Sequence, residues 1–368
     1  MDPFTILPYE LQEEICSYLK FPDIIESSFV CKSWYQVIGE SKSCMNRIFF
    51  RNPLQGLLEQ IDYILKSRRH YQHVILFEFD ENVKKDTKIL RNMKSIINKF
   101  SESLTNLSIS HDLQRTSELP KLRELDFFGS LSHRLIVANG LITKANNLIN
   151  FDIESCCLGN SSIEYLVNSL KDNSSLKDLK INDCRVMNAL NTVEVKFVLE
   201  EFHVHQTNSF ERNSNISNFI NKFKPSLKTI CGPLTFQEIA NLMTDFPKLL
   251  MLSVRNELLS FLSPGQEFLE MQINETIKVL SIDPAFGDLM DDRFYTNFNA
   301  IISKLGNVQL LLITFINTRI LDIILVCRSL KYIKYFHLED MSIIQLLRIG
   351  VDSHKIFIPI IPFWLDEP

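Results

Sequence analysis

The feature that most constrains the fold is a short apolar phrase that returns along the chain from Val74 onward. Its apolar residues occupy positions 1, 4 and 6, as in "LKDLKI" beginning at Leu176. First positions lie on average about 26 residues apart, a spacing typical of repeats with one strand and one helix each. A unit of that size has an apolar face that it cannot bury alone, so successive units must stack on one another. The sequence therefore predicts a chain of strand–helix units.

The turns before the phrases recur as well. Ser-Leu-Lys introduces the phrases at Leu176, Leu227 and Leu330, and Pro-Lys-Leu introduces those at Leu122 and Leu249. At 45% hydrophobic content, apolar triplets alone would often arise by chance, so these recurring turns strengthen the pattern. The predicted triplets are Val74/Phe77/Phe79, Leu104/Leu107/Ile109, Leu122/Leu125/Phe127, Leu148/Phe151/Ile153, Leu176/Leu179/Ile181, Leu199/Phe202/Val204, Leu227/Ile230 with Gly232 in third place, Leu249/Leu252/Val254, Ile277/Leu280/Ile282, Val308/Leu311/Ile313 and Leu330/Ile333/Tyr335.

Amphipathic helices are predicted between several of these phrases. One runs from Ser161 to Lys171, where Ser161 and Glu164 have the spacing of a capping box. Thr235 and Glu238 repeat that spacing before a second helix. The residues expected to face the core are Ile163, Leu166, Val167 and Leu170 in the first helix and Ile239, Leu242, Met243 and Phe246 in the second.

The first forty residues have a different pattern, with three short helices. The first begins near Pro8 and is ended by Phe21-Pro22, the second is capped by Asp23, and the third ends at Gly39. Helices this short in so small a segment bury too little surface to be stable without help. We therefore expect this segment to need a partner. The apolar stripe of the first helix is Leu11, Ile15, Tyr18 and Leu19, and the third helix carries Val30, Cys31, Trp34, Val37 and Ile38.

Over roughly residues 4–48 these features resemble the F-box family. The resemblance rests on Leu7-Pro8, Glu10-Leu11, Ile15, Tyr18-Leu19, Asp23 and the run Val30-Cys31-Lys32-x-Trp34. It implies a three-helix module that docks on the Skp-type adaptor of a cullin-RING ubiquitin ligase. The adaptor-binding residues that it implies are Leu7, Pro8, Leu11, Ile15, Leu19, Val30 and Trp34, of which Val30 and Trp34 also hold the packing of the three helices. The alternative is that residues 7–19 form an ordinary amphipathic helix packed into the main core.

The repeated part resembles the leucine-rich repeats common in F-box proteins, and "LKDLKINDC" from Leu176 to Cys184 is close to their LxxLxLxxC phrase. Cys156 has the equivalent ninth position, so both cysteines are interpreted as buried thiols. The predicted fold class is α/β: a short three-helix N-terminal F-box followed by a curved leucine-rich-repeat solenoid with a parallel sheet on its concave face. We assign residues 1–50 to the F-box, 51–72 to a connecting helix or linker, 73–350 to the solenoid and 351–368 to a C-terminal cap or tail.

Residues that alternate with the buried strand positions should point to the opposite face of the sheet. Carboxylates are frequent among them, which suggests a substrate-binding strip for a basic segment, although an ordinary solvated face is the simpler interpretation. The candidate substrate-binding residues are Glu124, Asp126, Asp152, Glu154, Asp178, Lys180, Glu201, His203 and His205. His203 and His205 have a spacing that zinc ligands can use, but no third ligand is evident nearby in the sequence, so we expect no metal.

Composition and missing motifs exclude several function classes. A formal net charge of -5 gives no general attraction to phosphate backbones or anionic lipid, so neither nucleic acid nor membrane is an expected partner. The common phosphate-binding and hydrolase motifs are absent from the sequence, and we expect no cofactor and no catalytic residue. The 8 cysteines contain no CxxC pair, and no secretory signal is evident, which favours the cytoplasm or nucleus.

The predicted function is that of a non-catalytic substrate receptor in an SCF-type ligase. Its partners would be the Skp-type adaptor, cullin and RING subunits through that adaptor, and an unidentified protein substrate. Two alternatives remain open: a repeat scaffold whose N-terminal helices only cap the solenoid, and an enzyme with an unfamiliar site.

Overall fold

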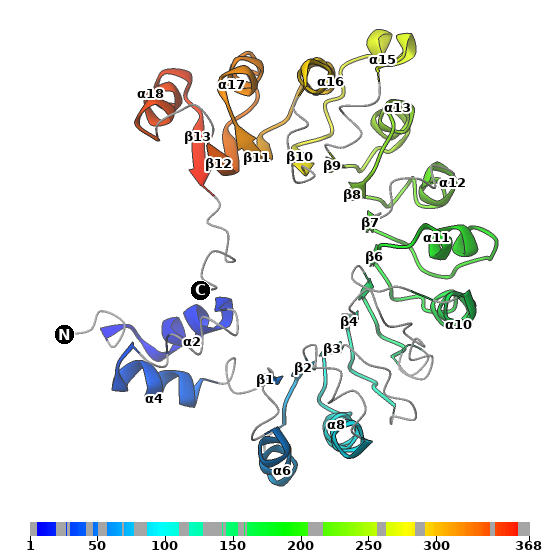
Figure 1. Ribbon diagram of the computed structural model, residues 1–368, viewed down its shortest axis with the longest axis vertical. Coiled ribbons are helices and arrows are strands. Elements are labelled where there is room, and N and C mark those ends of the chain that lie inside the picture. The colour runs from blue at the N-terminus through cyan, green and yellow to red at the C-terminus, as the bar shows by residue number, and fades with distance from the viewer. Residues whose placement is uncertain are drawn as a thin grey trace. The chain divides into compact units, whose positions relative to one another are not determined.

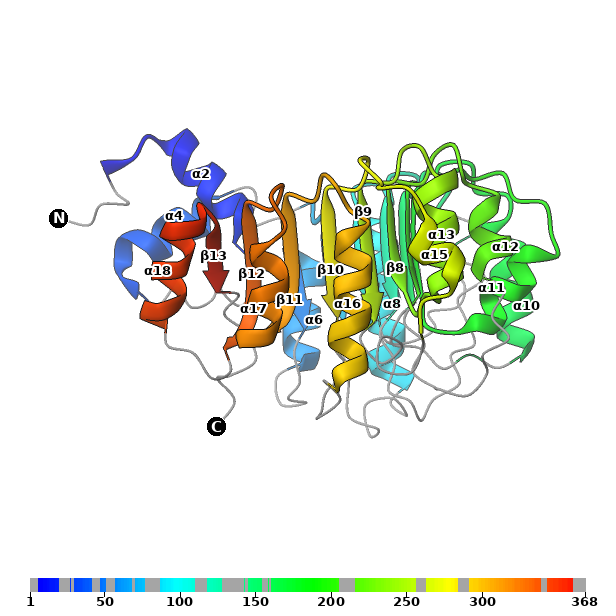
Figure 2. The ribbon, with the colours of Figure 1, turned by 90° about the horizontal axis from the view of Figure 1, so that it is seen from above.

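The computed structural model divides the chain into two compact units, one of Met1–Leu176 with Thr192–Phe197 and one of Lys177–Asn191 with Val198–Pro368. Each is a mixed α/β assembly in which a strand pairs in parallel with the next strand of the sequence (Figures 1 and 2). The residues that the structure describes are 6–19, 27, 30–41, 47–50, 57–67, 70–76, 87–109, 118–127, 142, 145–153, 158, 160–204, 216–255, 263–283, 291–338 and 343–359.

The first unit contains a parallel sheet with the strand order β1-β2-β3-β4-β5. Helices α6 and α8 lie on one side of these strands (Figure 1). The strands are β1 (Arg47–Phe50), β2 (His73–Leu76), β3 (Asn106–Ile109), β4 (Glu124–Phe127) and β5 (Asn150–Ile153). The helices are α2 (Tyr9–Tyr18), α4 (Lys32–Glu40), α6 (Leu57–Lys66), α8 (Thr87–Phe100) and α10 (Asn160–Leu170).

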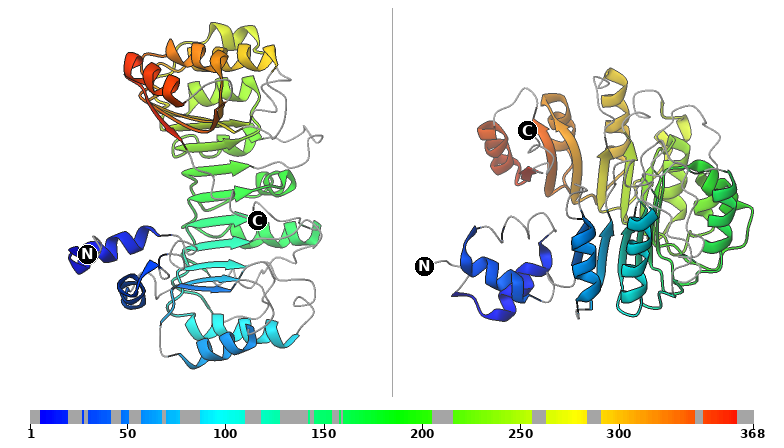
Figure 3. Two further views of the ribbon diagram at one scale, coloured as in Figure 1. Left: turned by 60° about the vertical axis from the view of Figure 1, so that its left-hand side comes forward. Right: turned by 60° about the horizontal axis from the view of Figure 1, so that its bottom comes forward.

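The second unit contains a parallel sheet with the order β6-β7-β8-β9-β10-β11-β12-β13, and its helices cover one face of it (Figures 2 and 3). The strands are β6 (Asp178–Ile181), β7 (Glu201–Val204), β8 (Thr229–Gly232), β9 (Met251–Arg255), β10 (Val279–Asp283), β11 (Leu310–Ile316), β12 (Tyr332–Leu338) and β13 (Ile356–Pro359). The helices are α11 (Cys184–Asn191), α12 (Ile216–Asn221), α13 (Phe236–Asp245), α15 (Gln266–Glu270), α16 (Asp292–Ser303), α17 (Thr318–Leu325) and α18 (Ile343–Ser353).

Strand pairing tests the predicted register directly. Position 4 of one phrase lies beside position 4 of the next, as Leu107 pairs with Leu125 in the first unit and Leu280 with Leu311 in the second. The register is confirmed for these phrases but is wrong for the first one. Val74 pairs with Leu107, so it occupies position 4 instead of position 1, and the buried Tyr71 takes position 1.

The pairing also corrects where the sheet begins and ends. Strand β1 pairs with β2, so Ile48 and Phe50 belong to the sheet, and helix α6, expected in a linker, lies between two paired strands. At the other end, β13 extends the sheet into the segment assigned to a cap or tail. Its phrase is atypical, because position 1 is His354, an exposed residue with φ 57°, and position 6 is Pro359. Residues 360–368 of the assigned tail lie outside the described residues.

The serine of the recurring Ser-Leu turn has a structural role. Ser226 Oγ donates to the carbonyl of Leu199, position 1 of the preceding phrase, at 2.7 Å. In the first unit, Ser103 Oγ donates to the carbonyl of Tyr71 at the same distance of 2.7 Å. Both hydroxyls thereby supply partners for backbone acceptors that the parallel ladder does not reach.

Lysines join one helix end to the next repeat. Lys222 Nζ donates to the carbonyls of Leu190 and Asn191 at the end of α11, both at 3.0 Å. Lys99 does the same for Leu65 and Ser67 at the end of α6, and Lys304 for Leu269 and Met271 at the end of α15. The last carbonyls of a helix have no partner within it, and a cation is favourable at that end. Each such lysine stabilises the helix before it, and so couples neighbouring repeats.

Of the two predicted capping boxes, the one at Ser161 is wrong, because α10 already begins at Asn160 and Ser161 lies inside the helix. The capping box of Thr235 and Glu238 is confirmed, since each side chain bonds the backbone amide of the other. Asp291 and Asn317 cap α16 and α17 without a reciprocal bond, each side chain accepting from one amide, that of Phe294 and that of Ile320. These caps fix the helix starts, and with them the residues that face the sheet.

Asn274 should contribute strongly to the stability of the second unit. It is buried, its Nδ2 donates to the Met243 carbonyl at 2.6 Å, and its Oδ1 accepts from the amides of Thr276 and Ile277. We expect Asn274→Ala to lower the free energy of unfolding by roughly 2 kcal/mol, because buried backbone groups lose their partners. Urea denaturation of the full chain measures this. The exposed Asn241→Ala is the control, and an equal effect of both changes would contradict the role of Asn274.

Glu200 should make stability depend on pH. Hydrogen bonds from Lys177 and Lys228 lower its pKa from 4.5 to about 2. A lowered folded-state pKa stabilises the folded chain above the unfolded pKa, and the effect disappears as the pH falls from about 4.5 towards 2. We expect Glu200→Gln to cost roughly 1 kcal/mol at pH 7 and almost nothing below the folded pKa. Denaturation across this pH range tests it, and a difference that persists at the acid end would contradict it.

Candidate functional site

The two described helices of the N-terminal segment share a small apolar core. Cys16 of α2 and Ile38 of α4 are buried at its centre. Gln12 donates its Nε2 to the Leu7 carbonyl at 2.9 Å, which provides a partner for a backbone acceptor just before α2. The residues packed partly buried against the central pair are Leu7, Leu19, Trp34 and Val37. The middle helix that the sequence predicts falls mostly outside the described residues.

A second side of α2 is apolar and exposed. Leu11 is 45% exposed and Ile15 is 37% exposed, and Tyr18 is exposed as well. Spacings of four and three residues place these side chains in one stripe on the helix. Cys16, which is buried, lies on a different side of the same helix. The adaptor stripe, defined as Leu11, Ile15 and Tyr18, is therefore uncovered apolar surface of the kind that marks interaction sites.

The predicted adaptor contacts fall into two groups. Leu7, Leu19 and Trp34 join the small core, whereas Pro8, Leu11 and Ile15 are exposed. Val30 is 67% exposed, so the prediction that it holds the helix packing is wrong. The reason is the backbone at Cys31, which is extended with φ -162° and ψ 172° and breaks the helical register between Val30 and Trp34.

In the first unit, carboxylates on the exposed strand face are held by neighbouring side chains. Asn106 of β3 donates to Glu124 of β4, and Ser108 Oγ donates to Asp126 at 2.8 Å. Asp152 lies beside Asp126 in the strand register. These predicted substrate residues are thus brought together on adjacent strands, while Glu154 lies outside the described residues.

In the second unit, the same kind of face carries the remaining predicted residues. Asp178 pairs with Glu201 and Lys180 pairs with His203, while Cys231 of β8 lies on the other side of His203. His205 lies outside the described residues. The predicted strip therefore has members in both units, and each unit brings its own members together.

The second unit also places carboxylates close to His203, where the sequence had offered no third candidate ligand. Oxygen atoms of Asp178 and Glu201 and a ring nitrogen of His203 all lie within 4.8 Å of one another. The expectation that no third candidate ligand lies near His203 is therefore wrong, because Asp178 comes from the adjacent strand β6 and joins Glu201 of the histidine's own strand. Burial lowers the pKa of His203, but the hydrogen bond and charge of Cys231 and the charge of Asp178 outweigh it and raise the pKa.

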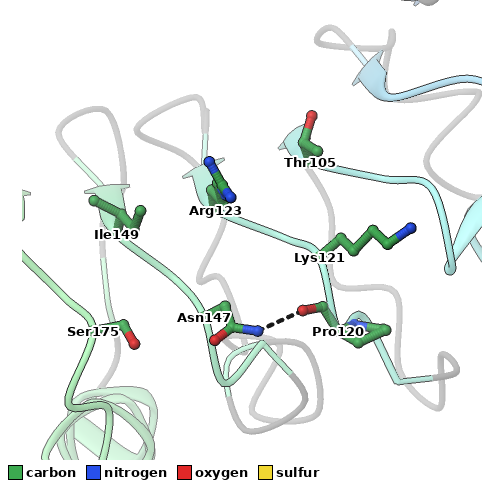
Figure 4. A pocket seen from close by; sticks show the side chains of 7 residues that line it. All are labelled: Thr105, Pro120, Lys121, Arg123, Asn147, Ile149 and Ser175. Atoms are coloured by element: carbon green, nitrogen blue, oxygen red, sulfur yellow. Dashed lines mark hydrogen bonds between the residues drawn. The ribbon is translucent and has the colours of Figure 1, made fainter.

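A pocket of about 470 Å³ opens in the first unit, where β3, β4 and β5 begin (Figure 4). Asn147 donates to the Pro120 carbonyl at 2.7 Å and ties two of its turns together. Lys121 and Arg123 are cationic, and the lining includes no carboxylate, so the pocket suits an anionic group. Sequence reasoning interpreted Pro-Lys-Leu only as a turn and missed these cations. The lining residues are Thr105, Pro120, Lys121, Arg123, Asn147, Ile149 and Ser175.

Among the described helices, none combines the length and apolar character that crossing a lipid bilayer requires.

Comparison with known proteins identifies one part of the chain. No curated protein matches the sequence significantly. Residues 4–45 match the F-box domain, which confirms the resemblance found in the N-terminal residues and ends it just before β1.

Proposed function

We propose that this chain is the substrate-recognition subunit of an SCF-type ubiquitin ligase. The F-box match at residues 4–45 suggests binding to a Skp-type adaptor and, through it, to cullin and RING subunits. The observation that carries the proposal is the adaptor stripe, since Leu11 and Ile15 are exposed within the matched segment while Cys16 of the same helix is buried. A chain with this role would act in the cytoplasm or nucleus.

In this proposal the chain itself does no chemistry. F-box proteins are generally receptors, so the transfer of ubiquitin would depend on a conjugating enzyme held elsewhere in the assembly. The chain would hold a target lysine near the reactive thioester and so raise its effective concentration there. The strand–helix units, which we interpret as a curved leucine-rich-repeat solenoid, would present the target-binding surface.

For the target surface, we favour the exposed strand face. Its carboxylates in the first unit are fixed by donors from β3, so their charges are held in defined positions that can select a partner of opposite charge. A basic segment of a target protein would be complementary to this face. The basic pocket at the strand starts is the competing site, and it would prefer an anionic group.

The adaptor stripe leads to a direct binding test. Leu11→Asp combined with Ile15→Asp should reduce co-purification of a Skp-type adaptor at least about tenfold, because charged groups would be buried in an apolar interface. Leu7 is a poorer choice, since it packs in the small core and its change would disturb folding. Co-expression followed by pulldown measures the loss.

The control for this test is Tyr165→Asp, which changes an exposed apolar residue on α10 outside the F-box segment. It should leave adaptor binding unchanged. Failure of the unmodified chain to bind the adaptor would favour the alternative function, a repeat scaffold whose N-terminal helices only cap the solenoid.

Two opposite charge reversals distinguish the candidate target surfaces. Asp152→Lys on the strand face should reduce capture of target proteins at least about fivefold while leaving adaptor binding intact, since rim charges govern partner choice. Arg123→Glu in the pocket should have little effect. Quantitative mass spectrometry of proteins co-purified with each variant, normalised to the adaptor, measures capture. The opposite result would assign target binding to the pocket and to an acidic target group.

A further inference from the structure

We propose that Asp178, Glu201 and His203 form a zinc-binding site on the exposed strand face of the second unit. The site would use one oxygen from each carboxylate and one imidazole nitrogen, and water would complete the coordination. It is formed by residues of β6 and β7, which are not part of the F-box segment, and it does not depend on the ligase function.

The distances suit a small metal ion. The three ligand atoms lie within 4.8 Å of one another, and His203 Nε2 is 3.8 Å from Glu201 Oε2. Zinc bonds of about 2.0–2.1 Å in tetrahedral geometry place ligand atoms about 3.3 Å apart. Small side-chain rotations on a fixed pair of strands would therefore close the site.

The imidazole of His203 is held in an orientation that leaves one nitrogen for a ligand. Its side chain is 19% exposed, and its Nε2 is buried without a hydrogen-bond partner among the described residues. Cys231 is the register neighbour of His203 on β8, so its thiol is placed to bond the other nitrogen, Nδ1. Metal-binding histidines characteristically have such a bond on the second nitrogen, which fixes the ring. Cys231 is thus a positioning residue, and a metal at Nε2 would satisfy a buried polar atom.

The charges favour a divalent cation over a lone histidine–glutamate ion pair. Asp178 and Glu201 are register neighbours, so two carboxylates repel each other unless a cation lies between them. Lys180, beside His203 on the same face, offsets part of that negative charge. The nitrogen ligand selects zinc over calcium and magnesium, which bind oxygen atoms.

Cobalt(II) titration of the full-length chain tests the site, because Co(II) replaces zinc and gives visible absorption bands in a tetrahedral site. After removal of metal with a chelator, we expect one Co(II) per chain, displaced by zinc. His203→Gln, Asp178→Asn and Glu201→Gln should each weaken binding at least about tenfold, the lower end of what losing even an outer partner costs. Asp322→Asn, which removes an exposed carboxylate on α17, is the matched control and should bind like the unmodified chain.

Cys231 gives a further test of the geometry. Cys231→Ala should weaken Co(II) binding about tenfold, whereas Cys231→Ser, which keeps a hydrogen-bonding group, should restore most of it. Circular dichroism of each variant checks that the fold is retained. Zinc should also protect His203 of the unmodified chain from acylation by diethyl pyrocarbonate, as read by mass spectrometry, and this measurement needs no variant.

Absence of saturable Co(II) uptake by the unmodified chain would overturn the proposal, and so would uptake that all three ligand variants share. Unchanged acylation of His203 in the presence of zinc would likewise show that the cluster is only an ion pair.

Discussion

Burial of the strand residues at position 4 depends on the neighbouring strand, and most other features of the fold follow from that dependence. Leu252, for example, is fully buried between Ile230 and Leu280 of the adjacent strands. A single strand–helix unit would leave such a residue exposed, so no strand–helix unit is stable by itself. The lysines that reach back to the preceding helix end add a polar counterpart of the same dependence, as Lys222 does for α11. Adjacent strand–helix units therefore provide both the apolar contacts that bury a strand residue and the polar partners of a helix end.

The sequence predicted the fold where local and long-range signals agreed. Phrases preceded by Ser-Leu or Lys-Leu turns were aligned correctly because the turn fixes the start of the strand and burial fixes its phase. The first phrase was misaligned by three residues because its position 1 is Tyr71, an aromatic residue where the other predicted phrases have an aliphatic one. Strand β1 was overlooked because its residues had been assigned to the end of the F-box. A short apolar segment does not by itself indicate whether it belongs to a helix or to a strand.

The candidate sites divide in the same way. Helical spacing on one continuous segment predicted that Leu11, Ile15 and Tyr18 share a face of α2, whereas Leu19, predicted in the same stripe, packs in the small core. Val30 could not be placed, since a single extended residue at Cys31 changes the register that helical spacing assumes. The cluster adds Asp178 of β6 to Glu201 and His203 of β7, so its third member depends on strand pairing that spacing within one strand does not reveal. The cations of the pocket are likewise gathered from separate turns.

The last phrase of the second unit ends the pattern with residues that the earlier phrases avoid. His354 takes the place of the buried leucine, and Pro359 has no amide hydrogen to donate. A chain of interchangeable units could otherwise continue by accepting a strand from another copy of itself. Pro359 offers one donor fewer to a strand added beside β13, which makes such end-to-end growth less favourable.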